Sequence, residues 1–139
     1  MAENQKRSFA IMIVDDSMVV RLTMKNVLKI LGLEVVAEAA NGQEAVEKYK
    51  TVKPDLILLD LIMPKHDGFF ALQNILEFDP NAIIVIISGI ATYDNVIKAI
   101  KLGAKHFITK PFTPDEFYSK IYQVLKKFFP DSKVDLPLP

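Results

Sequence analysis

Apolar residues are distributed along the chain in short runs that alternate with longer stretches of helical periodicity. Most of the short runs are rich in Ile, Val and Leu, as buried strands are, and they cover Phe9–Val14, Glu34–Ala39, Asp55–Leu59, Ala82–Ile87 and His106–Thr109. Between these runs, apolar residues recur at helical spacing, and the first such set is Val19, Leu22, Val27, Leu28 and Leu31. The pattern predicts five consecutive strand-helix units, of which the last helix covers Pro114–Phe129.

Residues that favour helix ends and turns fall between the predicted elements. Gly32 and Gly103 lie where the first and fourth helices should end. The dipeptides Asn41-Gly42 and Asp79-Pro80 are typical of turns, and Thr113, followed by a proline and two acids, is typical of a helix start. Because the apolar runs are nearly continuous rather than alternating, they predict a doubly wound α/β fold, a parallel sheet with helices on both faces.

Polar residues gather at one predicted edge of this sheet, where the strands end. Asp15 and Asp16 follow the first strand, Asp60 the third, Ser88 the fourth and Lys110 the fifth. Each residue alone has a simpler explanation. Asp16 or Ser17 could cap the first helix and Ser88 the fourth, Asp60 could begin a turn, and Lys110 could be a solvated charge. Their coincidence at the carboxyl ends of parallel strands, where open sheets bind ligands, instead favours a single functional site.

Three carboxylates in one place need a cation, because like charges at short distance raise one another's pKa. A site with oxygen ligands and no histidine or cysteine suits Mg²⁺. With Mg²⁺ and the Lys110 ammonium neutralising phosphoryl oxygens, an ionised aspartate can attack phosphorus without a general base, and Ser88 can hydrogen-bond a transferred oxygen. Asp60, in the middle of the predicted sheet, is the candidate nucleophile.

Composition limits the classes to which the protein can belong. The 139 residues, half of them apolar, fit one domain, and the absence of cysteine excludes disulfides and thiolate sites. Lys plus Arg and Asp plus Glu number 17 each, so no net basic charge attracts nucleic acid or a membrane. The polar residues 1–8 and the short run after them resemble neither a signal peptide nor a membrane span. These features predict a soluble cytoplasmic protein.

Four motifs, taken together, resemble the receiver domain of two-component response regulators. They are VDDS at 14–17, LLDLIMPKHDG at 58–68, SG at 88–89 and LGAKHFITKPF at 102–112, in the order and spacing of that family. The resemblance extends over residues 9–129. It implies a flavodoxin-like (βα)5 fold with strand order 2-1-3-4-5, flanked by a polar extension over residues 1–8 and a proline-rich tail over residues 130–139.

The resemblance also implies a chemical role, in which the domain accepts a phosphoryl group from a histidine kinase or phosphotransfer protein with Mg²⁺ as cofactor. Asp60 corresponds to the phosphoacceptor, Asp16 to a direct metal ligand, and Asp15 to a residue that acts mainly through metal-bound water. The backbone carbonyl of Ile62 corresponds to the remaining protein ligand. Such a domain is not an enzyme with turnover; it catalyses its own phosphorylation and dephosphorylation.

Further positions correspond to parts of the family's switch. Ser88 matches the hydroxyl that moves toward the phosphoryl group, and Lys110 matches the lysine that pairs with that group. Pro111 is expected to follow a cis peptide bond, and Gly89, which lacks a side chain, leaves the phosphoryl entrance open. Phe107 occupies an aromatic switch position that is frequently tyrosine, so it either turns inward when Ser88 moves or simply packs in the core.

Two positions that flank the path of the attacking water in this family are both isoleucine here, Ile62 and Ile90. Neither side chain can orient water by hydrogen bonding, which predicts slow autodephosphorylation within the range of such domains. Unchanged or longer phosphoryl lifetimes in both Ile62→Asn and Ile90→Glu would contradict this prediction. His66, where an apolar residue is usual, is interpreted as a solvated loop residue rather than a metal ligand.

After Phe129 the sequence has ten residues with three prolines, a composition typical of an exposed tail or linker. Its ending favours a stand-alone receiver over the receiver portion of a longer transcriptional regulator. We expect a monomer, or a phosphorylation-dependent dimer, that contacts a downstream protein through its fourth helix, fifth strand and fifth helix. Candidate contact residues there are Tyr93, Lys98, Lys101, Lys105, Phe112 and Tyr118.

Two other classes share part of this chemistry. A flavodoxin would have the same fold, but its phosphate-binding loop after the first strand is rich in Ser, Thr and Gly, whereas this loop is acidic. A Mg²⁺-dependent phosphatase that forms an aspartyl phosphate would share the nucleophile, the metal and the lysine. It ordinarily needs a second acid near the nucleophile, and residues 61–63 supply none. Yellow colour would support the first class, and repeated turnover of a phosphomonoester the second.

Overall fold

The computed structural model describes residues 9–63, 67–89 and 92–130. Strands and helices alternate through these residues in the predicted order. The strands are β1 (Ala10–Val14), β2 (Glu34–Ala39), β3 (Leu56–Leu59), β4 (Ile84–Ser88) and β5 (His106–Thr109). The helices are α1 (Met18–Ile30), α2 (Gly42–Val52), α3 (Gly68–Phe78), α4 (Tyr93–Leu102) and α5 (Pro114–Phe128). Among the described residues, no helix combines the length and the apolar character needed to cross a membrane.

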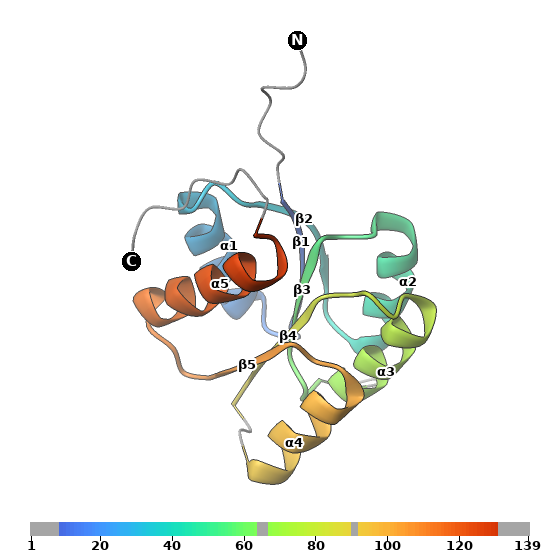
Figure 1. Ribbon diagram of the computed structural model, residues 1–139. Coiled ribbons are helices and arrows are strands. Elements are labelled where there is room, and N and C mark those ends of the chain that lie inside the picture. The colour runs from blue at the N-terminus through green and yellow to red at the C-terminus, as the bar shows by residue number, and fades with distance from the viewer. Residues whose placement is uncertain (1–8, 64–66, 90–91, 131–139) are drawn as a thin grey trace.

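The strands form one parallel sheet in the order β2-β1-β3-β4-β5, which confirms the predicted fold class and strand order. The chain adds β2 on one side of β1 and then adds β3, β4 and β5 on the other side. As a result, α1 and α5 cover one face of the sheet, and α2, α3 and α4 cover the other (Figure 1). The reversal between β1 and β3 is the place where an open parallel sheet binds its ligand.

Both faces of the sheet are buried, because successive strand residues point to opposite sides. In β1, Ile11 and Ile13 pack in the cluster that contains α1 and α5 residues, whereas Met12 and Val14 pack in the cluster that contains α2, α3 and α4 residues. All four side chains are fully or almost fully buried. This double burial explains why the sequence shows continuous apolar runs instead of alternating ones.

Backbone hydrogen bonds explain where β4 departs from its predicted boundaries. The strand begins at Ile84 instead of Ala82, because the Ala82 N–H donates to the Asp79 carbonyl at 3.1 Å in the preceding turn. It continues to Ser88, which pairs with Thr109 of β5. The extra residue matters for the site, since it fixes the backbone of Ser88 at the edge of the sheet.

Capping residues set the ends of the helices. As predicted, Gly103 ends α4, at a φ of 120° that favours glycine, and Thr113 begins α5 with a capping box. Asn41 caps the start of α2 instead of forming a separate turn with Gly42, because its side chain accepts the Glu44 N–H at 2.9 Å.

Candidate functional site

The predicted polar residues lie at the carboxyl-terminal edge of the sheet. Asp15 and Asp16 follow β1, Asp60 follows β3, Ser88 ends β4 and Lys110 follows β5. Ligand atoms of the three aspartates lie within 4.8 Å of one another. This proximity follows from the topology, since β1 and β3 are hydrogen-bonded neighbours and their ends leave the sheet together.

Asp15 is buried, and its backbone and carboxylate are both held by hydrogen bonds. Its N–H donates to the Ala39 carbonyl of β2 at 3.0 Å. Its Oδ1 accepts the Ser17 N–H at 2.8 Å, and its Oδ2 lies 2.6 Å from Lys110 Nζ. The Asp15 carboxylate therefore has a fixed orientation before any ligand binds. Asp16, the next residue, is exposed.

Asp60 is the second buried carboxylate of the cluster, with 6 % of its surface exposed. Its N–H donates to the Val14 carbonyl at 2.9 Å, and its Oδ1 accepts the Ile62 N–H at 3.2 Å. Its Oδ2 lies 3.1 Å from Lys110 Nζ. Burial raises the pKa of Asp60 above its ordinary value, with a contribution from the Asp15 charge, while Lys110 and the Ile62 N–H oppose the increase.

Lys110 joins the acids of two different strands through its ammonium group. Burial alone would lower the pKa of Lys110, but its hydrogen bonds and ion pairs with Asp15 and Asp60 outweigh burial and raise that pKa. The Lys110 N–H also donates to the Ser88 carbonyl at 2.9 Å, which fixes the backbone from which the side chain extends. The peptide bond between Lys110 and Pro111 is cis.

The charges of this cluster suit a divalent cation. Three carboxylates and one ammonium leave two formal negative charges, which an ion of charge two would balance. The donor atoms are all hard oxygens, and they come from two buried acids with fixed backbones and one exposed acid. Mg²⁺ binds such sets of a few carboxylates and completes its coordination with water. The residues present therefore fit Mg²⁺, with Asp15, Asp16 and Asp60 as its carboxylates.

The other predicted site residues lie on β4, on β5 and in the loops after β3 and β4. Ser88 is completely buried at the end of β4, and the adjacent Gly89 is exposed, with space where a Cβ would lie. Phe107 of β5 is half-buried and packs against the cluster that contains α2, α3 and α4 residues. The Ile62 side chain is exposed to solvent. Two further predicted positions, Ile90 and His66, lie outside the described residues.

Gly68 belongs to the site through its backbone, a role that the sequence analysis missed. Its N–H donates to the Leu61 carbonyl at 2.9 Å, which draws the start of α3 against the loop after β3. A Cβ at this position would lie 2.1 Å from the carbonyl oxygen of Asp60. Its sequence signals were its place at the end of the LLDLIMPKHDG motif and directly after Asp67, the N-cap of α3, and neither signal reveals what the glycine approaches.

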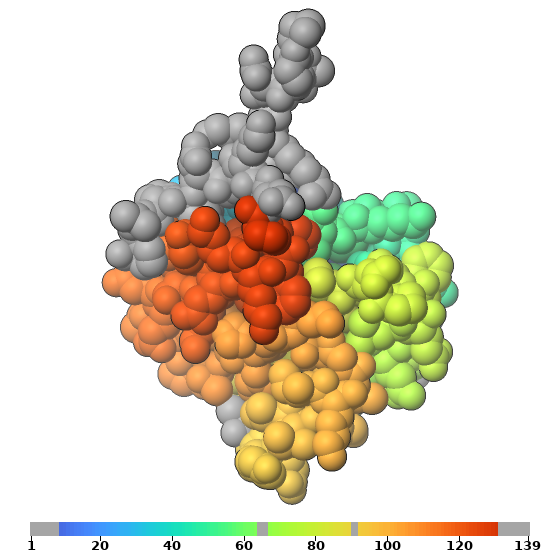
Figure 2. All heavy atoms as spheres, in the orientation of Figure 1, coloured from blue at the N-terminus to red at the C-terminus, as the bar shows by residue number. Residues whose placement is uncertain are grey.

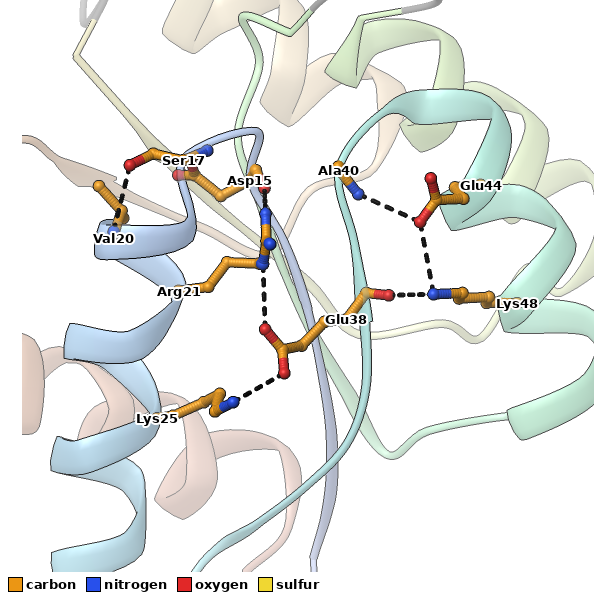
Figure 3. A network of polar contacts seen from close by, with 9 residues as sticks. All are labelled: Asp15, Ser17, Val20, Arg21, Lys25, Glu38, Ala40, Glu44 and Lys48. Carbon is orange, nitrogen blue, oxygen red and sulfur yellow. Dashed lines mark hydrogen bonds and ion pairs between the residues drawn. The ribbon is translucent and has the colours of Figure 1, made fainter.

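Arg21 of α1 is the second residue that the sequence analysis missed. Its guanidinium donates to the Asp15 carbonyl through Nη1 at 2.5 Å and to Glu38 of β2 through Nε at 3.0 Å (Figure 3). The side chain is mostly buried, at 15 % exposure. An arginine near the start of an amphipathic helix is usually a solvated surface residue, so the sequence pattern gave no reason to select it.

Comparisons with known proteins agree with this arrangement. The family model of the response regulator receiver domain matches residues 11–122. CheY of Thermotoga maritima is 44 % identical over 116 residues, which cover 84 % of this chain and 97 % of that protein. CheY of Bacillus subtilis is 46 % identical over 115 residues, which cover 83 % of this chain and 96 % of that protein.

A solved structure gives the same result at the level of the fold. The CheX-CheY-BeF3-Mg²⁺ complex from Borrelia burgdorferi contains a chain that is 36 % identical and superposes with a TM-score of 0.80, covering 87 % of this chain and 89 % of that one. One family accounts for the strand order, for the acidic cluster beside a lysine and for the family-model match over residues 11–122. This protein belongs to the response regulator receiver domain family.

Proposed function

We propose that the protein is a cytoplasmic signalling switch that accepts a phosphoryl group on Asp60 from a histidine kinase or phosphotransfer protein. The observation that carries the proposal is the group of three aspartates next to Lys110, of which Asp60 alone follows the central strand, β3. The relatives named above are chemotaxis proteins, and one was crystallised with BeF3 and Mg²⁺. Their likeness supports a signalling role for this chain.

The proposed transfer is a displacement at phosphorus. An Oδ atom of ionised Asp60 attacks the phosphorus of a phosphohistidine, the P–N bond breaks, and the imidazole nitrogen leaves with the electron pair. Lys110, which already lies 3.1 Å from Asp60 Oδ2, pairs with a phosphoryl oxygen, and the Ser88 hydroxyl donates to another. Asp15, Asp16, Asp60 and the Ile62 carbonyl would hold Mg²⁺, which when bound would neutralise charge on the phosphoryl oxygens.

The proposed output is a change in the surface formed by α4, β5 and α5. Attraction of Ser88 to the phosphoryl group would shift the loop after β4, and Phe107 would turn into the vacated space. Figure 2 shows α4 (yellow to orange) and α5 (orange to red) on one face of the molecule, where a partner can reach both. Proposed contact residues on this surface are Tyr93, Lys98, Lys101, Lys105, Phe112 and Tyr118.

The chemistry can be tested with a small phosphodonor. Wild type and Asp60→Asn are incubated with acetyl phosphate in the presence of Mg²⁺ or of excess chelator, and intact masses are measured. We expect one added phosphoryl group in wild type with Mg²⁺, and none in Asp60→Asn or in the chelator. Labelling of Asp60→Asn, or labelling of wild type without a divalent ion, would contradict the proposal.

The same samples separate a switch from a phosphatase. Phosphomonoester substrate in large excess should release less than one equivalent of phosphate per protein during the time in which acetyl phosphate labels the protein fully. Release of many equivalents would instead support the Mg²⁺-dependent phosphatase.

A further inference from the structure

Arg21 is an unusual surface arginine, because both sides of its guanidinium have acceptors and most of the side chain is buried. One side faces the backbone carbonyl of Asp15, and the other faces the carboxylate of Glu38 on β2 (Figure 3). The planar fork of arginine can reach two acceptors in fixed directions, which a lysine cannot do. Arg21 thus connects α1, the end of β1 and β2, and it contacts the backbone of Asp15, a member of the acidic cluster.

The Asp15 carbonyl depends on this contact for its hydrogen bond. Asp15 is 1 % exposed, so its carbonyl has little access to bulk water, and a buried carbonyl without a partner is unfavourable. The other polar groups of Asp15 have partners of their own, namely Ala39, Ser17 and Lys110. Loss of the Arg21 contact would therefore leave the peptide group between Asp15 and Asp16 free to rotate, and this rotation would shift Asp16 relative to the carboxylate of Asp15, which Ser17 and Lys110 hold in place.

Glu38 keeps the guanidinium in place. It accepts from Arg21 Nε at 3.0 Å and from Lys25 Nζ at 2.8 Å, so two cations of α1 share one carboxylate. The hydrogen bond from Lys25 lowers the pKa of Glu38, and Arg21 lowers it further, although burial opposes them. The Glu38 backbone carbonyl also accepts from Lys48 of α2. Lys25 thus has the same partner and the same charge as Arg21, but the structure gives it no contact with Asp15.

Two effects of Arg21 on a bound cation have opposite signs. As a positive charge near the site, Arg21 would repel Mg²⁺, and its removal would tighten Mg²⁺ binding. As a support for Asp15 it would favour Mg²⁺, and its removal would weaken binding. Glu38, which also pairs with Lys25, offsets part of the guanidinium charge at contact distance, while no other described side chain donates to the Asp15 carbonyl. The support effect should therefore be the larger one.

We infer that Arg21 is a positioning residue of the metal site, which holds the Asp15–Asp16 peptide group in the orientation that Mg²⁺ binding requires. The inference rests on the proposed function, because it assumes that the acidic cluster takes up Mg²⁺. Residues that orient metal ligands typically change metal affinity by about 10- to 100-fold when they are replaced.

The test compares Arg21→Met, Arg21→Lys and the matched control Lys25→Met. Mg²⁺ affinity is measured by calorimetric titration, and stability without metal is measured by urea unfolding in chelator. We expect Mg²⁺ binding to weaken by about 10-fold in Arg21→Met and to remain weakened in Arg21→Lys, since lysine keeps the charge but not the fork. Lys25→Met should bind Mg²⁺ within about 2-fold of wild type, even if it loses comparable stability.

Three results would overturn the role of Arg21. They are unchanged or tighter Mg²⁺ binding in Arg21→Met, wild-type affinity in Arg21→Lys, and equal weakening in Lys25→Met. Each of these requires that wild type itself binds Mg²⁺. Wild type that takes up no Mg²⁺ would contradict the proposed function as well, so the two failures can be told apart.

Discussion

At the scale of single residues, Gly68 shows how closely the backbone surrounds the acidic cluster. A Cβ on Gly68 would lie 2.1 Å from the Asp60 carbonyl oxygen and 2.6 Å from Leu61 Cα, distances at which backbone atoms must move apart. The hydrogen bond from the Gly68 N–H to the Leu61 carbonyl would be stretched by the same movement. The glycine is therefore needed for its small size, and not for an unusual backbone conformation.

Gly68→Ala is accordingly expected to destabilise the protein by about 1–3 kcal/mol, the usual range for overpacking, with more where backbone must shift. Gly89→Ala is the matched control, because a Cβ at Gly89 would meet nothing within 4 Å. Its stability should stay within about 0.5 kcal/mol of wild type. Urea unfolding of the three proteins measures the difference, and equal stabilities for the two variants would contradict the close approach.

His106 gives the fold a pH dependence of its own. Burial lowers the pKa of His106, and the positive charges of Lys120 and Lys127 lower it further. Its Nε2 is buried without a hydrogen-bond partner among the described residues. The imidazole is therefore held in its neutral form in the folded protein, while in the unfolded chain it takes up a proton near its ordinary pKa of about 6.5.

Because the unfolded state binds the proton more readily, wild type should lose stability as pH falls from about 7 toward 5. His106→Leu should lose less stability than wild type over this pH range. The carboxylates are common to both proteins, so their contribution cancels when the two stabilities are subtracted. For a fully buried group, each unit of pKa shift corresponds to roughly 1.4 kcal/mol of stability. The stability change due to His106 should be smaller than this, since solvent reaches part of the ring. Unfolding curves at several pH values measure it, and parallel stability profiles would exclude the effect.

At the scale of helices and strands, a tyrosine joins α2 to the end of α3. Tyr49 of α2 donates its hydroxyl hydrogen bond to Asp79, the C-cap of α3, and its ring meets Phe78 edge-on at 6.2 Å. Burial raises the pKa of Tyr49, and the carboxylate of Asp79 raises it further. The phenol is therefore held as a donor, and the two helices share a polar contact in addition to their apolar one.

Tyr49→Phe should lower stability by about 1.5–3 kcal/mol, the range for hydrogen bonds to charged groups, while leaving the ring packing unchanged. Tyr122→Phe, on α5, is the control, and should change stability by less than about 0.5 kcal/mol. Thermal or urea unfolding measures both variants. A Tyr49→Phe protein as stable as wild type would show that the hydroxyl contributes nothing to the contact between α2 and α3.

The elements themselves could be read from the sequence, because local signals and burial agree for them. Continuous apolar runs predicted the strands, and residues such as Gly103 and Thr113 marked helix ends that the structure confirms. The clustering of three aspartates and Lys110 also followed from strand ends in a parallel sheet. These features need only the period of the pattern and the topology.

Contacts between elements could not be read in the same way. Arg21 is seen to support Asp15 only when α1 is packed on the sheet, and Gly68 is seen to approach Asp60 only when α3 is in place. The sequence around each residue is compatible with an ordinary surface position. Their roles come from distances across the fold, which local periodicity does not contain.

At the scale of the whole molecule, the acidic cluster opposes folding when no cation is bound. Asp16 is exposed, yet its carboxylate lies within 4.8 Å of two others. Like charges at that distance repel one another, and Lys110 balances only part of the charge. Metal uptake should therefore increase the free energy of unfolding of the entire domain, since the unfolded chain does not form the site.

Asp16→Asn separates the repulsion between carboxylates from the stabilisation by bound metal. Without Mg²⁺ it should be more stable than wild type by about 0.5 kcal/mol, the scale of an exposed charge interaction. At a Mg²⁺ concentration about 100-fold above the dissociation constant, wild type should gain about 2.7 kcal/mol, and Asp16→Asn clearly less. Glu77→Gln, an exposed acid of α3, should keep the full gain. The measurement is urea unfolding with Mg²⁺ or chelator, and an equal gain in Asp16→Asn would contradict the ligand assignment.

The position of Lys110, late in the sequence, determines when a newly synthesised chain can form the complete site. Its ammonium contacts carboxylates that precede it by 95 and 50 residues, so the site combines early, middle and late parts of the sequence. A nascent chain released from the ribosome up to β4 would already carry all three acids, but it would lack the lysine. Translation must pass β5 before Lys110 can join the three acids, and a truncated product that ends earlier would lack the complete site.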